Sequence, residues 1–231
     1  MNLRIGRSIV ALAAASVSSA AGAALLEFSL GNTNPGFAPG STLDVPTMAA
    51  AQAGQPAPFD TSYGSDILGS IGDFSQTWTH SFVALTDPIV SATLTIGIFD
   101  HDSAASGSQL ANFTIDGVGF TTELDARFEA GGGATEREYD EYTVTLAASD
   151  FAGLADGTVD VALALQGPGL VDNLGTGGID ESSNNGANLI FSRLVIETQE
   201  STPPPPTVPE PGSLALIGLG MAALAARRRR A

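Results

Sequence analysis

The sequence predicts an all-β fold, a single antiparallel β-sandwich, flanked by two terminal segments that lie outside the fold. Apolar and polar residues alternate with period two in several runs, as expected for strands with one buried face. Turn dipeptides such as Asp116-Gly117 and Asp156-Gly157 punctuate these runs. No helical periodicity of useful length appears, apart from one turn over Phe151–Ala155. Strands with one polar face and many turns favour antiparallel sheets around a single core.

The alternation predicts about eight strands. In the clearest of them, Val90–Asp100, apolar residues fall on one face and Ser91, Thr93 and Thr95 on the other. The segment Gly31–Gly72 is rich in Gly, Pro, Ala and Ser and shows little alternation, and a structureless stretch of this length is often functional or disordered. The expected strands are Leu25–Leu30, Thr77–Leu85, Val90–Asp100, Leu110–Ile115, Val118–Leu124, Tyr142–Leu146, Val159–Leu165 and Leu189–Thr198.

The order of these strands resembles the jelly-roll modules that are common in secreted carbohydrate-binding proteins. The resemblance rests on the pattern of strands, without a sequence motif. It implies a jelly-roll-like sandwich, in which two Greek keys form two facing sheets.

Composition excludes several classes of function. The 231 residues include 25 acidic and 9 basic residues, 2 His and no Cys, and every basic residue is Arg. The absence of Cys excludes disulfides, thiol catalysis and Cys-ligated zinc, and two His cannot form a three-His zinc site. The absence of Lys excludes Walker-type phosphate loops and Schiff-base enzymes. A net charge of -16 argues against nucleic acid as a partner, because it repels a phosphate backbone.

The N-terminus has the three parts of a secretory signal peptide, which we place at residues 1–23. Arg4 and Arg7 form a positive region, Ser8–Val17 is a short apolar stretch, and Ala21-Gly22-Ala23 is a small-residue cleavage site. We therefore expect the general export machinery and signal peptidase as partners, with cleavage before Ala24.

The C-terminus also has three parts. A linker at residues 199–207 contains four consecutive prolines, which favour an extended, semi-rigid spacer. An apolar segment, Ser213–Ala226, would form a helix about 21 Å long, shorter than a bilayer core of about 30 Å. The Arg cluster Arg227, Arg228, Arg229 and Arg230 follows it and would stay cytoplasmic. This arrangement predicts temporary anchoring in the inner membrane after export.

The motif Val208-Pro209-Glu210-Pro211, the short apolar helix and the Arg cluster together resemble the PEP-CTERM sorting signal of Gram-negative bacteria. The resemblance covers residues 208–231 and implies that an exosortase, a transpeptidase-like membrane enzyme, removes the tail. It further implies a final place at the cell surface or in the extracellular matrix, and an association with exopolysaccharide or biofilm. It implies nothing about the fold of residues 24–198, which we take as the sandwich domain.

The domain is strongly acidic, with a net charge of -21 over residues 24–200, and such a charge attracts divalent cations. Asp100 and Asp102 follow a strong strand, two positions apart, where loops collect binding groups. The acidic loop 172–185 adds Asp172, Asp180 and Glu181. Because calcium prefers several hard oxygen ligands, these five residues form a candidate calcium site. The alternative is a set of solvated loop acids.

No catalytic arrangement stands out. His101, Asp102 and Ser103 are adjacent, so their side chains diverge and cannot form a triad. His80 shares a strand face with Trp78 and is better explained as a partly buried sheet residue than as a base. Two carboxylates could support glycoside hydrolysis, but in so acidic a domain their spacing in sequence carries no information. We therefore expect a non-enzymatic protein.

Aromatic side chains are the usual platforms for sugar rings. Trp78 lies in an alternating strand and is expected in the core. Tyr63 and Tyr139 lie in expected loops and are predicted to be exposed.

The sequence thus predicts an exported, non-catalytic surface or matrix protein, sorted by an exosortase-type system and associated with exopolysaccharide. The first alternative is a calcium-dependent, lectin-like module, and the second is a secreted hydrolase.

Overall fold

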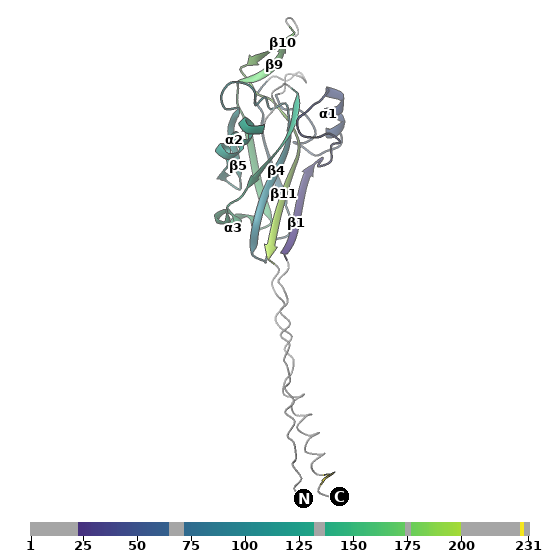
Figure 1. Cartoon of the computed structure of the whole chain (residues 1–231), viewed down its shortest axis with the longest axis vertical. Helices are drawn as coiled ribbons and strands as arrows, with labels where there is room; N and C mark the ends of the chain where they lie inside the picture. The colour runs from purple at the N-terminus through teal and green to yellow at the C-terminus, as the bar shows by residue number, and fades with distance from the viewer. Residues whose placement is uncertain (1–22, 65–71, 132–136, 174–176, 200–226, 229–231) are drawn as a thin grey trace, which may run out of the picture. The chain divides into compact units, whose positions relative to one another are not determined.

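The computed structural model describes residues 23–64, 72–131, 137–173, 177–199 and 227–228 (Figure 1). Residues Gly22–Glu200 form one compact unit. Nearly all of the expected signal peptide, and the expected linker beyond Gln199, lie outside the described residues. The same holds for the motif Val208–Pro211 and the expected apolar helix.

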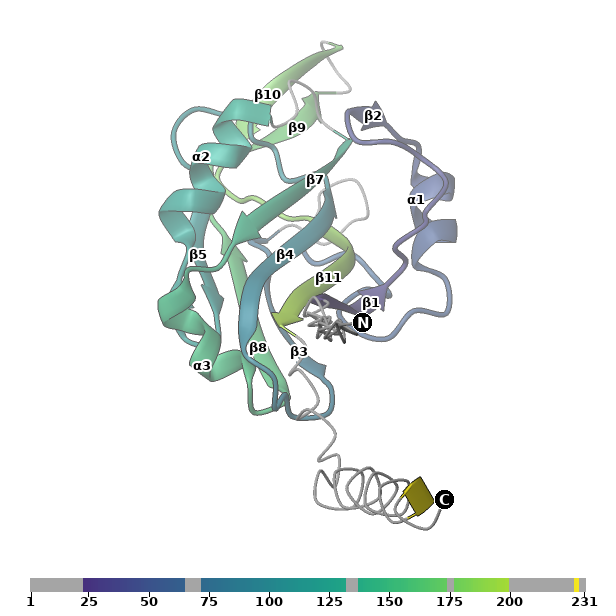
Figure 2. The ribbon, with the colours of Figure 1, turned by 60° about the horizontal axis from the view of Figure 1, so that its bottom comes forward.

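Two antiparallel sheets form the body of the compact unit (Figure 2). The five-stranded sheet contains, in spatial order, β1 (Ala23–Gly31), β11 (Asn188–Gln199), β4 (Ile89–Phe99), β7 (Glu138–Thr145) and β2 (Ser41–Thr42). The four-stranded sheet contains β3 (Ser75–Ser81), β8 (Thr158–Leu165), β5 (Leu110–Ile115) and β6 (Val118–Gly119). A separate hairpin, β9 (Gly169–Asn173) with β10 (Gly178–Ser182), lies at the end of the sandwich opposite to the C-terminal end of β11 (Figure 1).

The strand connections form a jelly roll, as predicted. The first long strand pairs with the last (β1 with β11), and the next pairs nest inside: β3 with β8, β4 with β7 and β5 with β6. Members of successive pairs alternate between the two sheets. This nesting is the rolled double-Greek-key arrangement.

The main core fills the space between the sheets. Alternate residues of β4 (Ala92, Leu94, Ile96 and Ile98) point inward and are almost fully buried, as the sequence alternation predicted. They share one hydrophobic cluster with Phe113 of β5 and with inward residues of β8 and β11. Burial of this cluster in a chain without disulfides supplies the main stabilisation.

A second, smaller core lies on the outer face of the five-stranded sheet. It contains Met48 of α1 (Val45–Gln52) together with Tyr139 and Phe191 of the sheet. Helix α1 begins after Asp44, whose side chain accepts a hydrogen bond of 2.9 Å from the amide of Thr47 and caps the helix. Segment 31–72, predicted as an irregular loop, therefore contains a short strand (β2) and a helix that covers part of this sheet.

One predicted strand is wrong. Val118–Leu124 contains only the two-residue β6, and the chain then enters helix α2 (Thr121–Gly131). Leu124 and Phe128, one turn apart, are buried on the same face of α2. Glu123 and Arg127 form an exposed (i, i+4) ion pair on another face. Because α2 buries only two of its eleven residues, the helical periodicity of its sequence is weak. The apolar residues at the start of segment 118–124 suggested a strand instead.

The remaining helical elements are short. The expected single turn near Phe151 is present as α3 (Phe151–Leu154), preceded by the 3-10 turn η2 (Ala148–Asp150). The hairpin β9–β10 was not expected, because its residues show no buried alternation: every residue of β10 is exposed or half-exposed.

Candidate functional site

The outer surface of the four-stranded sheet is lined by small polar side chains. Because side chains alternate along a strand, the inward positions hold buried residues such as Trp78, Val161 and Phe113, and the positions between them face solvent. The outward residues of three neighbouring strands are all exposed or half-exposed. This hydroxyl face consists of Ser75, Thr77, Thr79, Ser81, Asn112, Thr114, Thr158, Asp160, Ala162 and Ala164.

The strand register aligns these residues in rows across the sheet. Ala162 of β8 lies directly between Thr77 of β3 and Thr114 of β5. Ala164 lies between Ser75 and Asn112 in the next row. The central strand thus carries methyl groups where its neighbours carry longer polar side chains, which leaves a depression along the middle of the face.

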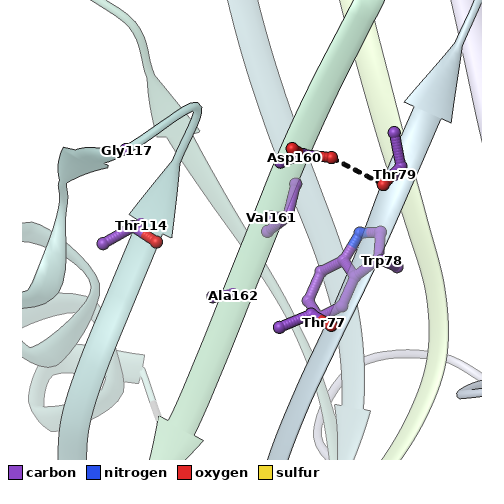
Figure 3. A pocket seen from close by; sticks show the side chains of 8 residues that line it. All are labelled: Thr77, Trp78, Thr79, Thr114, Gly117, Asp160, Val161 and Ala162. Atoms are coloured by element: carbon purple, nitrogen blue, oxygen red, sulfur yellow. Dashed lines mark hydrogen bonds between the residues drawn. The ribbon is translucent and has the colours of Figure 1, made fainter.

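A groove of about 300 Å³ occupies part of this depression (Figure 3). Thr77 and Thr79 line one side, Thr114 and Gly117 the other, and Ala162 lies at the centre. Such a groove offers hydroxyl groups as both donors and acceptors on either side of a small apolar floor.

Asp160 is the single charged residue among the ten that define the hydroxyl face. It lies opposite Thr79 in the register, and the Thr79 hydroxyl donates to its Oδ1 at 2.6 Å (Figure 3). The main chain of the same residue is held as well, because the amide of Asp116 donates to the Asp160 carbonyl at 2.7 Å. The carboxylate therefore has a fixed position at one end of the groove.

The residues Asp100-His101-Asp102 were expected in a loop where binding groups collect, but the structure buries all three. The His101 ring is 4.6 Å from the ring of Phe128, and its Nε2 lies 2.7 Å from the Tyr142 hydroxyl. Burial lowers the pKa of His101 to about 3, so the imidazole is neutral at physiological pH. His101 is therefore a buried structural residue, and the alternative of solvated loop acids is wrong for Asp100 and Asp102.

The five candidate calcium ligands occupy two settings. Asp100 and Asp102 are buried and accept hydrogen bonds from the amides of Arg137 and Leu170 at 3.1 and 2.8 Å. The other three lie on the β9–β10 hairpin, where Asp172 pairs with Arg137 at 2.6 Å and Glu181 accepts from the Ser106 amide; Asp180 is the third. The amide of Leu170 in β9 thus connects Asp102 to the hairpin.

Within the described residues, no group of three or more His, Cys, Asp or Glu side chains is placed to hold a metal ion. Amide and main-chain oxygens also bind calcium. The calcium site stays a prediction.

The aromatic side chains differ in part from expectation. Trp78 is in the core, as predicted, with its ring centroid 6.0 Å from that of Phe59. The predicted exposure of Tyr139 is wrong: the ring is fully buried, and its hydroxyl donates to Glu141 at 2.9 Å. Tyr63 is half-buried and contacts Phe74.

The predicted sheet position of His80 is confirmed. Its Nε2 lies 2.9 Å from the Ser192 hydroxyl, and burial lowers the pKa of His80 to about 4.

The hydroxyl face was not predicted from the sequence. Its signal was present as the Thr77-Trp78-Thr79 pattern and as Ala162 and Ala164 at outward positions of an alternating strand. The rows depend on the register between β3, β8 and β5, which are separated by many residues along the chain. No local pattern fixes that register.

A comparison with known protein families decides the role of the C-terminus. Residues 207–230 match the PEP-CTERM protein-sorting motif. The chain carries a PEP-CTERM sorting signal. The signal indicates an exported protein that an exosortase sorts, with passage through the membrane before processing.

The PEP-CTERM match covers about a tenth of the chain and does not extend to the sandwich domain. No match was found among curated proteins, and none among solved structures. Among the residues that the structure describes, no helix is long and apolar enough to cross a membrane. Of the Arg cluster, Arg227 and Arg228 are described and exposed, and Arg229 and Arg230 lie outside the described residues.

Proposed function

We propose that the sandwich domain of this PEP-CTERM protein is a non-catalytic module that binds exopolysaccharide at the cell surface or in the extracellular matrix. The hydroxyl face is the proposed contact surface. Under this proposal, the sorting signal directs export, and the sandwich domain attaches the protein to a polysaccharide matrix or biofilm.

The observation that carries the proposal is the contrast between the hydroxyl face and the rest of the domain. The domain has a net charge of -21, yet nine of the ten residues that define this face are uncharged. Ser, Thr and Asn side chains can each donate and accept, which suits the hydroxyl groups of sugars. Aromatic stacking contributes little here, because Trp78 is buried beneath the groove.

The lining of the groove supports a non-catalytic role. Glycoside hydrolysis of the usual kind needs two carboxyl groups flanking the scissile bond, and Asp160 is the only carboxyl group among the residues that line this groove. Both histidines are buried and neutral at physiological pH. A binding module needs neither feature.

The test is binding of the purified exported protein to soluble polysaccharides from bacterial matrices. Substitution Ala162→Leu fills the centre of the groove without a change of charge, and a larger apolar residue suits an outward strand position. The matched control is Ala130→Leu, which adds the same atoms at an exposed position of α2. Loss of binding in Ala162→Leu alone is the expected result. Equal binding by all three proteins, or no binding to any polysaccharide, would contradict the proposal.

The processing step has its own test. Mass analysis of the exported protein is expected to show a chain that begins at Ala24 and lacks the Arg cluster. Export machinery, signal peptidase and exosortase would act in turn on the two ends. A mature chain that still carries Arg227–Arg230 would contradict removal of the tail.

A calcium-dependent, lectin-like module is the second candidate. One observation favours it: the β9–β10 hairpin bonds to Asp102 through the amide of Leu170, so the two halves of the predicted calcium site are neighbours. Under this alternative, calcium would order the hairpin end of the sandwich and sugar binding would require the metal.

A further inference from the structure

Binding of an uncharged glycan would not explain why the hydroxyl face contains the charged side chain of Asp160. A neutral glycan needs hydroxyl and amide partners, and the neighbouring Thr, Ser and Asn side chains supply these. A carboxylate at the groove must lose part of its hydration when any ligand covers it, which costs free energy unless the ligand supplies a donor or a positive charge.

No basic side chain of the domain compensates the charge of Asp160. The domain has no Lys and three Arg, all of which the structure describes. Arg127 pairs with Glu123 and Arg137 pairs with Asp172. Arg193 belongs to β11 of the other sheet, where its guanidinium lies 6.0 Å from the ring centroid of Phe191.

A second carboxylate belongs to a residue beside this end of the groove, although that residue does not line it. Asp116 precedes Gly117, a lining residue, in the turn between β5 and β6. Its main-chain amide bonds to the carbonyl of Asp160, and the Asp160 amide lies 3.5 Å from its Oδ1. The groove therefore combines hydroxyl groups along its sides with uncompensated negative charge at one end.

We propose that the groove selects a polysaccharide that carries free amino groups, with a protonated sugar amine placed against the Asp160 carboxylate. This inference rests on the proposed function and narrows its substrate class. The Thr79 hydroxyl holds Oδ1 of Asp160, so the carboxylate faces the ligand in one orientation. The sugar hydroxyl groups bond to Thr77 and Thr114 on either side of Ala162. The net charge of the domain draws a cationic chain towards the protein and repels one built from uronic acids.

The experiment compares three hexasaccharides against the purified exported protein by calorimetry, at a pH at which the sugar amines are protonated. The probes are a glucosamine hexamer, an N-acetylglucosamine hexamer and a galacturonate hexamer. The glucosamine hexamer is expected to bind best, its affinity is expected to fall as salt is added, and the galacturonate hexamer is expected not to bind.

Two variants separate the groove from the general charge of the domain. Asp160→Asn keeps the shape of the side chain and removes its charge, and Glu129→Gln makes the same change of charge at an exposed position of α2. We expect Asp160→Asn to weaken binding of the glucosamine hexamer about 2- to 5-fold, the range that an exposed ion pair contributes, and to leave the N-acetylated hexamer unaffected. Glu129→Gln is expected to bind like the unaltered protein.

The possible outcomes test the preference for amino sugars separately from polysaccharide binding itself. Equal binding of the amino and N-acetylated hexamers overturns the inference and leaves polysaccharide binding intact. Equal losses in Asp160→Asn and Glu129→Gln also overturn it, because the preference would then come from net charge alone. If none of the hexamers binds and the matrix polysaccharides of the previous test do not bind either, both the inference and the proposed function fail.

Discussion

Thr79 and Asp160 face each other across β3 and β8, and the Thr79 hydroxyl donates to Oδ1 of Asp160 at 2.6 Å. Both side chains are exposed, so this hydrogen bond contributes little to the stability of the sheet. Under the proposed function, its main effect is to restrict the rotamers of a carboxylate at the end of the groove, which would reduce the conformational entropy lost when a ligand binds.

Substitution Thr79→Val should therefore weaken ligand binding more than it weakens folding. Valine has the shape of threonine and a high strand propensity, but it cannot donate to Asp160. We expect an affinity for the glucosamine hexamer about 2- to 5-fold lower, with a melting temperature close to that of the unaltered protein. Thr79→Ser keeps the donor and is expected to bind nearly normally. Normal binding by Thr79→Val, or a loss in Thr79→Ser as large as that in Thr79→Val, would contradict the role given to the Thr79 hydroxyl.

Gly97 should not tolerate a side chain. It lies in the central strand β4, where a Cβ would come within 2.6 Å of the Tyr139 hydroxyl and closer still to the Phe191 ring. Gly97→Ala is expected to destabilise the protein by about 1–3 kcal/mol through overpacking of the second core. Gly119→Ala is the control, since a Cβ there meets no atom within 4 Å. Chemical denaturation measures both, and an unchanged midpoint for Gly97→Ala would contradict the packing described for Tyr139 and Phe191.

Asp140 should make stability depend on pH. Burial, with a contribution from the charge of Glu138, raises the pKa of Asp140 from 3.8 to about 6. Between about pH 4 and 6 the folded protein holds a proton that the unfolded chain has lost, so this group lowers stability as pH rises through that window. Asp140→Asn keeps an acceptor for the Gly40 amide and removes the titration. The variant should be the more stable protein above pH 6, by about 1–3 kcal/mol, and the difference should vanish near pH 4.

Thermal melts at several pH values measure this difference. His80 and His101 contribute the opposite slope, because burial lowers the pKa of each. Both remain in the variant, so the difference between the two proteins isolates Asp140. Glu129→Gln is a control expected to show no such trend. A stability difference between Asp140→Asn and the unaltered protein that is constant from pH 4 to 8 would contradict the assignment.

Calcium gives a further prediction. If Asp100, Asp102 and the β9–β10 hairpin hold the ion, the melting temperature should rise in calcium relative to EDTA, because an ion that binds only the folded state stabilises it. The double variant Asp100→Asn, Asp102→Asn should lose that difference. Identical melts of the unaltered protein in calcium and in EDTA would count against the calcium site and the lectin-like alternative.

The strands were predictable where burial imposes a strict period. The inward residues of β8, and those of β4 from Ala92 onward, are apolar and buried, so alternation alone located both strands. Helix α2 was not predictable in this way, because it buries only Leu124 and Phe128. The burial of Tyr139 and of Asp100-His101-Asp102 was also missed. It results from α1, α2 and neighbouring loops packing over them, and these contacts join residues far apart along the chain.

The sequence alone determined that this protein is exported and sorted by an exosortase. A sorting signal is a short contiguous segment that another protein recognises. The order of motif, apolar stretch and Arg cluster can therefore be recognised from the sequence without knowledge of the fold. The sequence also determined the fold class, because strand alternation is a local property. Only the tertiary structure decided which residues share a surface. The groove joins Thr77, Ala162 and Thr114 from three strands, and their alignment depends on a register that the packing of the whole core sets.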